Sequence, residues 1–215
     1  MGTTELIAKA QTYFPKLQIK YKDQSTFMKI IGKLMFFNPT FMTHFVTTIG
    51  DTVYLPNEDY LKNNTEAFCD VFIHECTHMY DEKRLGFPYN VLYAFPQMLF
   101  LPMFLLLFVL SWKLVVPLAL LMLAPLPAPF RAYFEKRAYF VQMYAGYKLY
   151  NVDPAESGLR YTTWFKDGSY YFMWPIEQDT AWQQEALNIK AGKPSCASEP
   201  ALLQQVNDLI DAAKQ

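Results

Sequence analysis

Two histidines and a glutamate form a compact motif in the first half of the chain. His74, Glu75 and His78 stand in the order H-E-x-x-H, inside residues 65–85, a segment with the composition of a helix. Residues four apart lie one turn above each other on the same helix face, so both imidazoles can bind one metal ion. Bound zinc lowers the pKa of a water molecule to about 7, and a nearby glutamate can take its proton and pass it to a departing amine. The motif therefore predicts a zinc site with Glu75 as the catalytic base.

A third metal ligand must come from outside this motif, because a catalytic zinc ion normally has three protein ligands and one open position. The candidates are His44, Asp81 and Glu135. Asp81 follows His78 on the same rigid helix and cannot easily reach the opposite side of a tetrahedron. His44 is the only other histidine and stays a candidate. Glu135 is preferred, because a carboxylate on a second helix packed against the first completes a His-His-Glu set.

The order of these motifs resembles the zincin metallopeptidases whose third zinc ligand is a glutamate (the gluzincins), most closely the membrane-embedded CAAX-prenyl-protease-like family. That family has H-E-x-x-H on a helix, an apolar spanning hairpin, and then a helix with R-x-x-E-x-x-A-D. Residues 40–150 are similar in this order, with Arg131, Glu135 and Ala138 after the apolar stretch. Two positions depart from the pattern. Arg131 stands four residues before Glu135 rather than three, and Tyr139 replaces the aspartate that usually orients a zinc-bound histidine.

The resemblance implies an α+β, zincin-like domain, mostly helical, with a small antiparallel sheet and an inserted hydrophobic helical hairpin. It implies zinc held by His74, His78 and Glu135. A looser resemblance links the chain to small H-E-x-x-H proteins encoded by bacteriophages.

Two further roles follow from the zincin comparison. A zincin pairs extended substrate with the strand that precedes the motif helix, and residues 45–55 either supply this strand or form an ordinary sheet strand. A phenol can stabilise the negative charge that develops on the substrate oxygen. The candidates on the third-ligand helix are Tyr133, Tyr139 and Tyr144, of which we select Tyr139.

The surrounding pattern predicts the elements that position these residues. Residues 41–55 are rich in β-branched and aromatic side chains around Gly50 and Asp51, which is typical of a β-hairpin. Thr65 is the expected N-cap of the motif helix, and Gly86 its end. Further helices are expected at 3–14, 25–37, 132–150, 178–189 and 200–213. We expect a linker at 151–157 and a second, aromatic hairpin turning at Asp167 and Gly168. Residues 1–150 would form the zincin-like domain, and 151–215 an extension packed on it.

Between Leu85 and Arg131 the only charged residue is Lys113. Such a run is long enough for two membrane spans of about 20 residues each, at 93–110 and 114–130. Six prolines between 96 and 129 argue against straight spanning helices, and a core hairpin or a partner-binding surface is the alternative. Basic residues at both flanks favour a cytoplasmic active site on a membrane-associated protein.

Composition excludes other classes. The chain has 215 residues, with 19 basic and 20 acidic side chains, so it lacks the positive charge of a nucleic-acid binder. Its three cysteines have no framework spacing, and no disulfide is expected. The first residues lack the pattern of a secretory signal, so a cytoplasmic start is expected.

The sequence thus predicts a membrane-associated, zinc-dependent endopeptidase acting on a peptide or protein substrate. One alternative is a non-catalytic structural or assembly protein, for example of a phage particle, that keeps the metal site for stability and binds a membrane or a protein partner through its apolar segment. A weaker alternative is a zinc-free membrane anchor.

Overall fold

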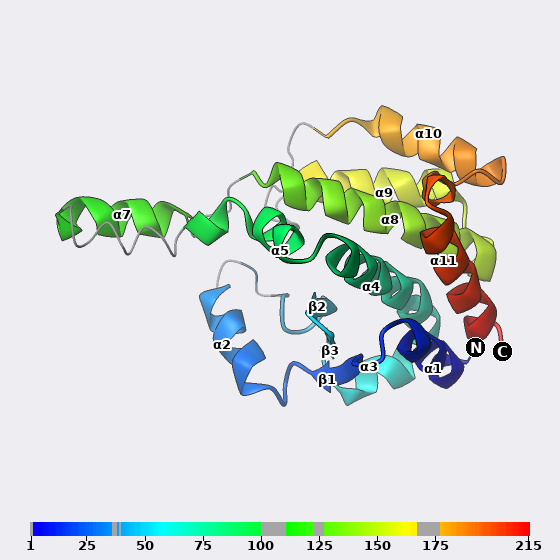
Figure 1. Cartoon of the computed structure of the whole chain (residues 1–215), viewed down its shortest axis with the longest axis horizontal. Coiled ribbons are helices and arrows are strands. Elements are labelled where there is room, and N and C mark those ends of the chain that lie inside the picture. The colour runs from blue at the N-terminus through cyan, green and yellow to red at the C-terminus, as the bar shows by residue number, and fades with distance from the viewer. Residues whose placement is uncertain (1, 36–37, 39, 100–110, 123–126, 167–176) are drawn as a thin grey trace.

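The computed structural model describes residues 2–35, 38, 40–99, 111–122, 127–166 and 177–215. The fold is α+β and mostly helical, with one small sheet (Figure 1). Its α-helices are α1 (Thr3–Tyr13), α2 (Thr26–Leu34), α3 (Glu58–Asn63), α4 (Thr65–Leu85), α5 (Phe87–Ala94), α7 (Trp112–Met122), α8 (Pro129–Tyr150), α9 (Pro154–Lys166), α10 (Asp179–Lys190) and α11 (Pro200–Ala213). Its strands are β1 (Gln18–Tyr21), β2 (Thr47–Ile49) and β3 (Thr52–Leu55), and short 3-10 turns lie at Gln97–Leu99 and Ser195–Ser198.

Helix α4 carries the H-E-x-x-H motif, as predicted. It ends at Gly86, whose φ of 65° is left-handed and whose N–H bonds to the carbonyl of Glu82. This conformation suits glycine, which has no Cβ to clash with the carbonyl. The start differs by one residue: Asn64, not Thr65, is the N-cap, and it makes no side-chain capping hydrogen bond.

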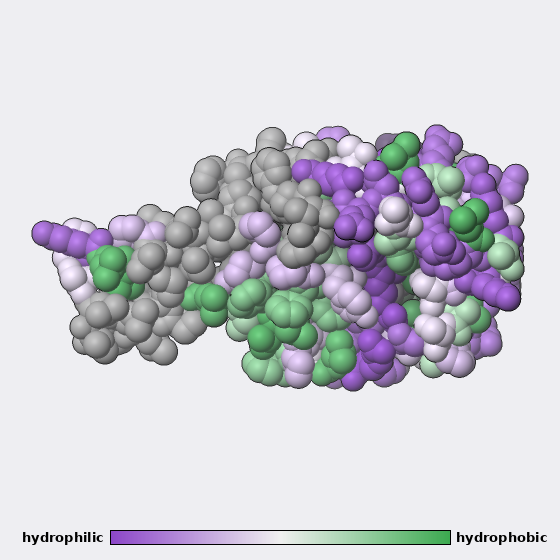
Figure 2. Space-filling view, turned by 90° about the horizontal axis from the view of Figure 1, so that it is seen from above, coloured by the Kyte–Doolittle hydropathy of each residue, from purple (hydrophilic) through white to green (hydrophobic). Residues whose placement is uncertain are grey.

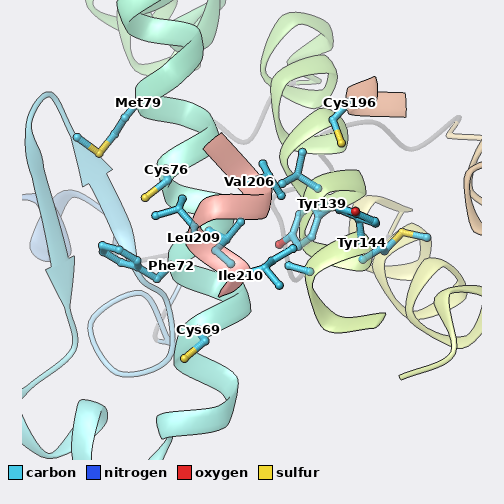
Figure 3. Close-up of a cluster of buried hydrophobic side chains, with 14 of the residues drawn as sticks. Cys69, Phe72, Cys76, Met79, Tyr139, Tyr144, Cys196, Val206, Leu209 and Ile210 are labelled. Atoms are coloured by element: carbon cyan, nitrogen blue, oxygen red, sulfur yellow. The ribbon is translucent and has the colours of Figure 1, made fainter. Parts of the chain in front are cut away.

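The hydrophobic core lies between α4, α8 and the C-terminal helices. One face of α4 presents fully buried side chains at a helical spacing, including Cys69, Phe72 and Cys76, and Leu209 of α11 packs beside them (Figure 3). Each fully buried side chain of the size of Phe72 contributes about 1.5–3 kcal/mol to folding. Because this face is anchored in the core, the remaining face of α4 presents the motif histidines to α8. Cys76, inside the motif, is therefore a packed small residue of the core.

The predicted hairpin is present. Strands β2 and β3 pair antiparallel, and Gly50 between them has a φ of 54°. The sheet is nevertheless mixed rather than antiparallel, because β1 pairs parallel to β3 and gives the order β1-β3-β2. No tight turn connects two parallel strands, so the sequence has no turn signal from which the pairing of β1 with β3 could be predicted. Strand β2 lies at the edge of this sheet.

The predicted pair of membrane spans is wrong, and so is the membrane-associated location that depended on it. Among the described residues, every helix falls short of the length or the hydrophobicity that a transmembrane span requires. Helix α5 has 8 residues and α7 has 11, with Pro117 inside it, whereas a span needs about 20. Residues 100–110 and 123–126 of the predicted hairpin lie outside the described residues.

Helix α7 projects from the body of the molecule (Figure 1). Hydrophilic residues cover the end that holds the two termini, and hydrophobic residues gather between that end and α7 (Figure 2). Trp112 and Leu114 on α7 are 66% and 54% exposed. Some of the apolar side chains of α7 therefore lie on the surface of the molecule.

The C-terminal segments are more helical than predicted. Residues 154–166, expected as the end of a linker and the first strand of a second hairpin, form α9. The expected turn at Asp167 and Gly168 lies outside the described residues. Helices α10 and α11 lie within a residue of their predicted bounds. Phe165, Trp182 and Leu202 from these helices share one core with the motif helix.

Candidate metal centre

The structure brings His74, His78 and Glu135 together. Nε2 of His74 lies 3.3 Å from Oε2 of Glu135, and Nε2 of His78 lies 3.5 Å from Oε1. The two Nε2 atoms are 3.1 Å apart. All three side chains are buried, and one donor atom from each lies within 4.8 Å of the others. Helix α4 supplies the imidazoles and α8, packed against it, supplies the carboxylate, as predicted.

These distances fit a single metal ion. Nitrogen and oxygen ligands that bind zinc at 2.0–2.2 Å in a tetrahedron lie about 3.3–3.6 Å from one another, close to the three distances between the donor atoms here. Two imidazoles with one carboxylate is also a donor set of catalytic zinc sites. The group could therefore hold a metal ion with no rearrangement beyond a few tenths of an ångström.

The three side chains are also electrostatically coupled. Burial opposes the charge of Glu135, but the imidazoles of His78 and His74 lower its pKa well below the usual value. Burial acts to lower the pKa of His78, yet the carboxylate of Glu135 raises it above the usual value. A buried carboxylate kept ionised in this way is ready to bind a cation.

Two tyrosines of α5 complete the surroundings of the ligands. The hydroxyl of Tyr89 lies 3.2 Å from Nδ1 of His78, and the hydroxyl of Tyr93 donates a hydrogen bond to Oε1 of Glu135. Burial first, and the charge of Glu135 second, raise the pKa of both phenols, so both stay neutral. Sequence reasoning missed them. Their spacing of four residues, the same as that of the histidines, is the signal that places both on one face of a helix.

The remaining predicted residues are placed as follows. Glu75 is 7% exposed and lines the cleft beside the two histidines. The ring of Tyr139 packs edge-on against His74, with ring centres 4.5 Å apart. Tyr133 is 56% exposed, and the hydroxyl of Tyr144 bonds instead to Asn207.

Neither alternative third ligand belongs to the described metal group. His44 is exposed, and its Nδ1 lies 2.8 Å from the hydroxyl of Thr43. Asp81 is fully buried and pairs with Arg137, whose Nε lies 3.0 Å from Oδ2. Of the candidates, only Glu135 stands opposite the two imidazoles.

A cleft of about 310 Å³ opens onto the ligands. Its walls include strand β2, both motif histidines and the tyrosines of α5. Strand β2 pairs with β3 on one side, and in the described part of the chain no strand pairs with its other side. The edge of the sheet therefore borders the site.

Comparison of the chain with models of protein families, with curated proteins and with solved structures gave no match.

Proposed function

We propose that this protein is a zinc-dependent endopeptidase of the zincin kind. The observation that carries the proposal is the buried group of two imidazoles and one carboxylate at the distances that a tetrahedral ion requires. Glu75, on the same helix, lines the cleft next to these ligands. The cleft and the adjacent sheet edge provide room for an extended peptide.

His74, His78 and Glu135 would hold the metal. Zinc bound there supplies a Lewis acid, which polarises a carbonyl group and makes water a nucleophile at neutral pH. Glu75 then works as the general base: its carboxylate accepts a proton from the attacking water and delivers it to the leaving nitrogen as the C–N bond breaks. The products are a carboxylate and an amine, and Glu75 returns to its ionised form.

Tyrosine hydroxyls stabilise the charge on the substrate oxygen. Tyr93 is a neutral phenol with its hydroxyl at Glu135, and so stands at the ligands as a hydrogen-bond donor. Tyr139, the residue selected from the sequence, packs on His74. Removing one donor of this kind typically lowers kcat by about 100- to 1,000-fold. The single O–H of Tyr93 already donates to Glu135 and would have to turn from it to reach the substrate oxygen, so Tyr139 stays the candidate for this role.

The substrate backbone adds to the sheet. Residues Thr47, Thr48 and Ile49 of β2 line the cleft, and the outer edge of this strand offers the main-chain groups that do not bond to β3. Pairing by main-chain hydrogen bonds binds an extended peptide of any sequence, and pockets beside it select the side chains.

The test is cleavage of a peptide library by the zinc-loaded protein and by Glu75→Gln. This substitution keeps the size of the side chain and removes the base, so we expect full zinc content with cleavage reduced by at least about 100-fold. Glu58→Gln, an exposed position on α3, serves as the matched control and should cleave as the parent does.

Equal cleavage by Glu75→Gln and the parent would refute the mechanism. Stoichiometric zinc with no cleavage of any peptide, and unfolding on chelation, would instead identify a non-catalytic protein whose metal ion stabilises the fold.

A further inference from the structure

A second cavity lies beside the metal centre. Its volume is about 710 Å³, and it shares Phe45, Val46, His74 and Glu75 with the cleft described above. The cleft extends along α4 toward Glu82, whereas the second cavity extends toward Ala67. The two hollows therefore meet at the catalytic base, and a side chain next to the scissile bond can enter the second one.

A carboxylate lies in the wall of this cavity. Asp70 stands one helical turn before His74, and its Oδ1 accepts a hydrogen bond from the N–H of Val71 while its Oδ2 accepts one from Nε2 of Gln142. Within the part of the chain that the structure describes, no lysine or arginine forms an ion pair with it. A partly buried carboxylate held only by neutral donors gains from a cation brought close to it.

Aromatic rings make up much of the remaining wall: Tyr60, Tyr139, Tyr150, Tyr161 and Trp164. The faces of such rings attract cations, and the attraction grows where water is excluded. Arg160 lies at this cavity too, but it is exposed, and its guanidinium carbon is 5.4 Å from the centre of the Tyr161 ring. This contact places one guanidinium group near the ring of the adjacent residue.

The charge of Asp70 reaches across the cavity. Burial raises the pKa of Asp70, which is the expected effect on a carboxylate short of solvent. Burial also raises the pKa of Tyr60 and of Tyr161, and the charge of Asp70 is the next cause in both cases. The negative potential thus covers more than one wall.

We infer that this cavity binds a lysine or arginine side chain of the substrate, with Asp70 as its counter-ion. The inference rests on the proposed peptidase function and names its substrate class: peptides with a basic residue next to the scissile bond. The rise of 1.5 Å per residue places Asp70 about 6 Å along the helix from His74, a distance that the long flexible stem of a lysine can cover.

Peptides that differ only in the residue on either side of the scissile bond test this inference. The parent should cleave peptides with arginine or lysine faster than those with norleucine, which has a similar length and no charge. Asp70→Asn removes the charge and keeps the shape, and should lower kcat/KM for the basic peptides by roughly 10- to 100-fold without changing cleavage of the norleucine peptides. Asp70→Glu should keep the preference, and Asp211→Asn, an exposed position on α11, should have no effect.

A binding experiment separates failure of this inference from failure of the proposed function. Zinc-loaded parent and Asp70→Asn are titrated with N-acetylarginine amide and N-acetylnorleucine amide by calorimetry. Tighter binding of the arginine compound by the parent alone supports the cavity assignment even if no peptide is cleaved. Cleavage with an aliphatic or aromatic preference that Asp70→Asn does not alter would overturn the inference and leave the peptidase proposal standing.

Discussion

Nδ1 of His78 lies 3.2 Å from the hydroxyl of Tyr89, across the turn at Gly86 that joins their two helices. When Nε2 of a histidine binds a metal ion, Nδ1 carries a hydrogen and needs an acceptor, and the phenol oxygen of Tyr89 is placed to accept it. Tyr89 therefore fixes the orientation of one ligand. No partner contacts Nδ1 of the other buried ligand, His74, among the described residues.

Tyr89→Phe should weaken zinc binding by about 10- to 100-fold, the usual effect of losing a hydrogen-bond partner of a metal ligand. The variant keeps the ring, which is packed against Phe134, so the fold should remain intact. Competition with a chromogenic chelator measures the affinity. Tyr133→Phe, at an exposed position on α8, is the control and should bind zinc as the parent does. Equal affinities in all three proteins would show that Tyr89 does not orient His78.

Removing the metal should destabilise the protein. A ligand that binds only the folded state adds about 2.7 kcal/mol to the unfolding free energy when its concentration is 100 times its Kd. We therefore expect Tm to rise with zinc concentration and to fall on chelation. Glu135→Ala lacks the third ligand, and its Tm should respond little to either treatment. A Tm of the parent that is independent of zinc up to millimolar concentration would mean that the three side chains do not form a metal site.

Much of the site follows from local sequence. The prediction that His74 and His78 share one helix face depends on a single helical turn, and the prediction of a hairpin depends on the tight turn at Gly50. Both features are local in sequence, and both predictions are confirmed. That Glu135 faces the histidines depends on the packing of α8 against α4, which local sequence does not predict. The resemblance to the zincin motif order was the basis of that prediction. Tyr93 was missed for the opposite reason: its place at Glu135 depends on α5 folding back from Gly86, and the apolar composition around it indicated a membrane span instead. A long segment without charged residues does not by itself distinguish a membrane span from a series of short helices interrupted by prolines.

Lys22 should make stability depend on pH. Its side chain is fully buried, and Nζ bonds to the carbonyl of Phe41, 2.8 Å away. Burial lowers its pKa to about 7, and the charge of Glu75 opposes this only in part. The unfolded chain keeps the proton up to about pH 10.4, whereas the folded protein releases it above pH 7, so the contribution of Lys22 to stability rises with pH between these values. Below pH 7 both states are protonated and the contribution is constant.

The measurement compares urea unfolding of the parent and of Lys22→Met across this range. The difference in unfolding free energy should change in favour of the parent by about 1.4 kcal/mol per pH unit above pH 7. Lys20→Met, an exposed position on β1 two residues before Lys22, should show no such slope. A pH-independent difference for Lys22→Met would mean that the buried amine keeps an ordinary pKa.

A buried ion pair behind the metal centre should stabilise the packing of α4 on α8. Asp81 is fully buried, and Nε of Arg137 lies 3.1 Å from its Oδ1 and 3.0 Å from its Oδ2. Nη1 of Arg137 continues to Glu199 at the start of α11, 2.6 Å away. Arg84 also approaches Asp81, at 3.6 Å, but its side chain is 40% exposed. These contacts of Asp81, Arg137 and Glu199 thus link α4, α8 and the start of α11. Of the two arginines that approach Asp81, only Arg137 is shielded from water.

Removing either arginine should therefore have unequal effects. Arg137→Met leaves a buried carboxylate without its main partner and should cost about 3–5 kcal/mol of unfolding free energy. Arg84→Met removes a solvent-exposed partner and should cost about 0–1 kcal/mol. In the double variant Asp81→Leu with Arg137→Met the unpaired charge is gone, so it should be more stable than Arg137→Met alone. Urea unfolding measures all three. Equal losses of unfolding free energy for Arg137→Met and Arg84→Met would show that burial does not set the strength of this ion pair. A double variant less stable than Arg137→Met would show that the carboxylate of Asp81 stabilises the fold without its partner.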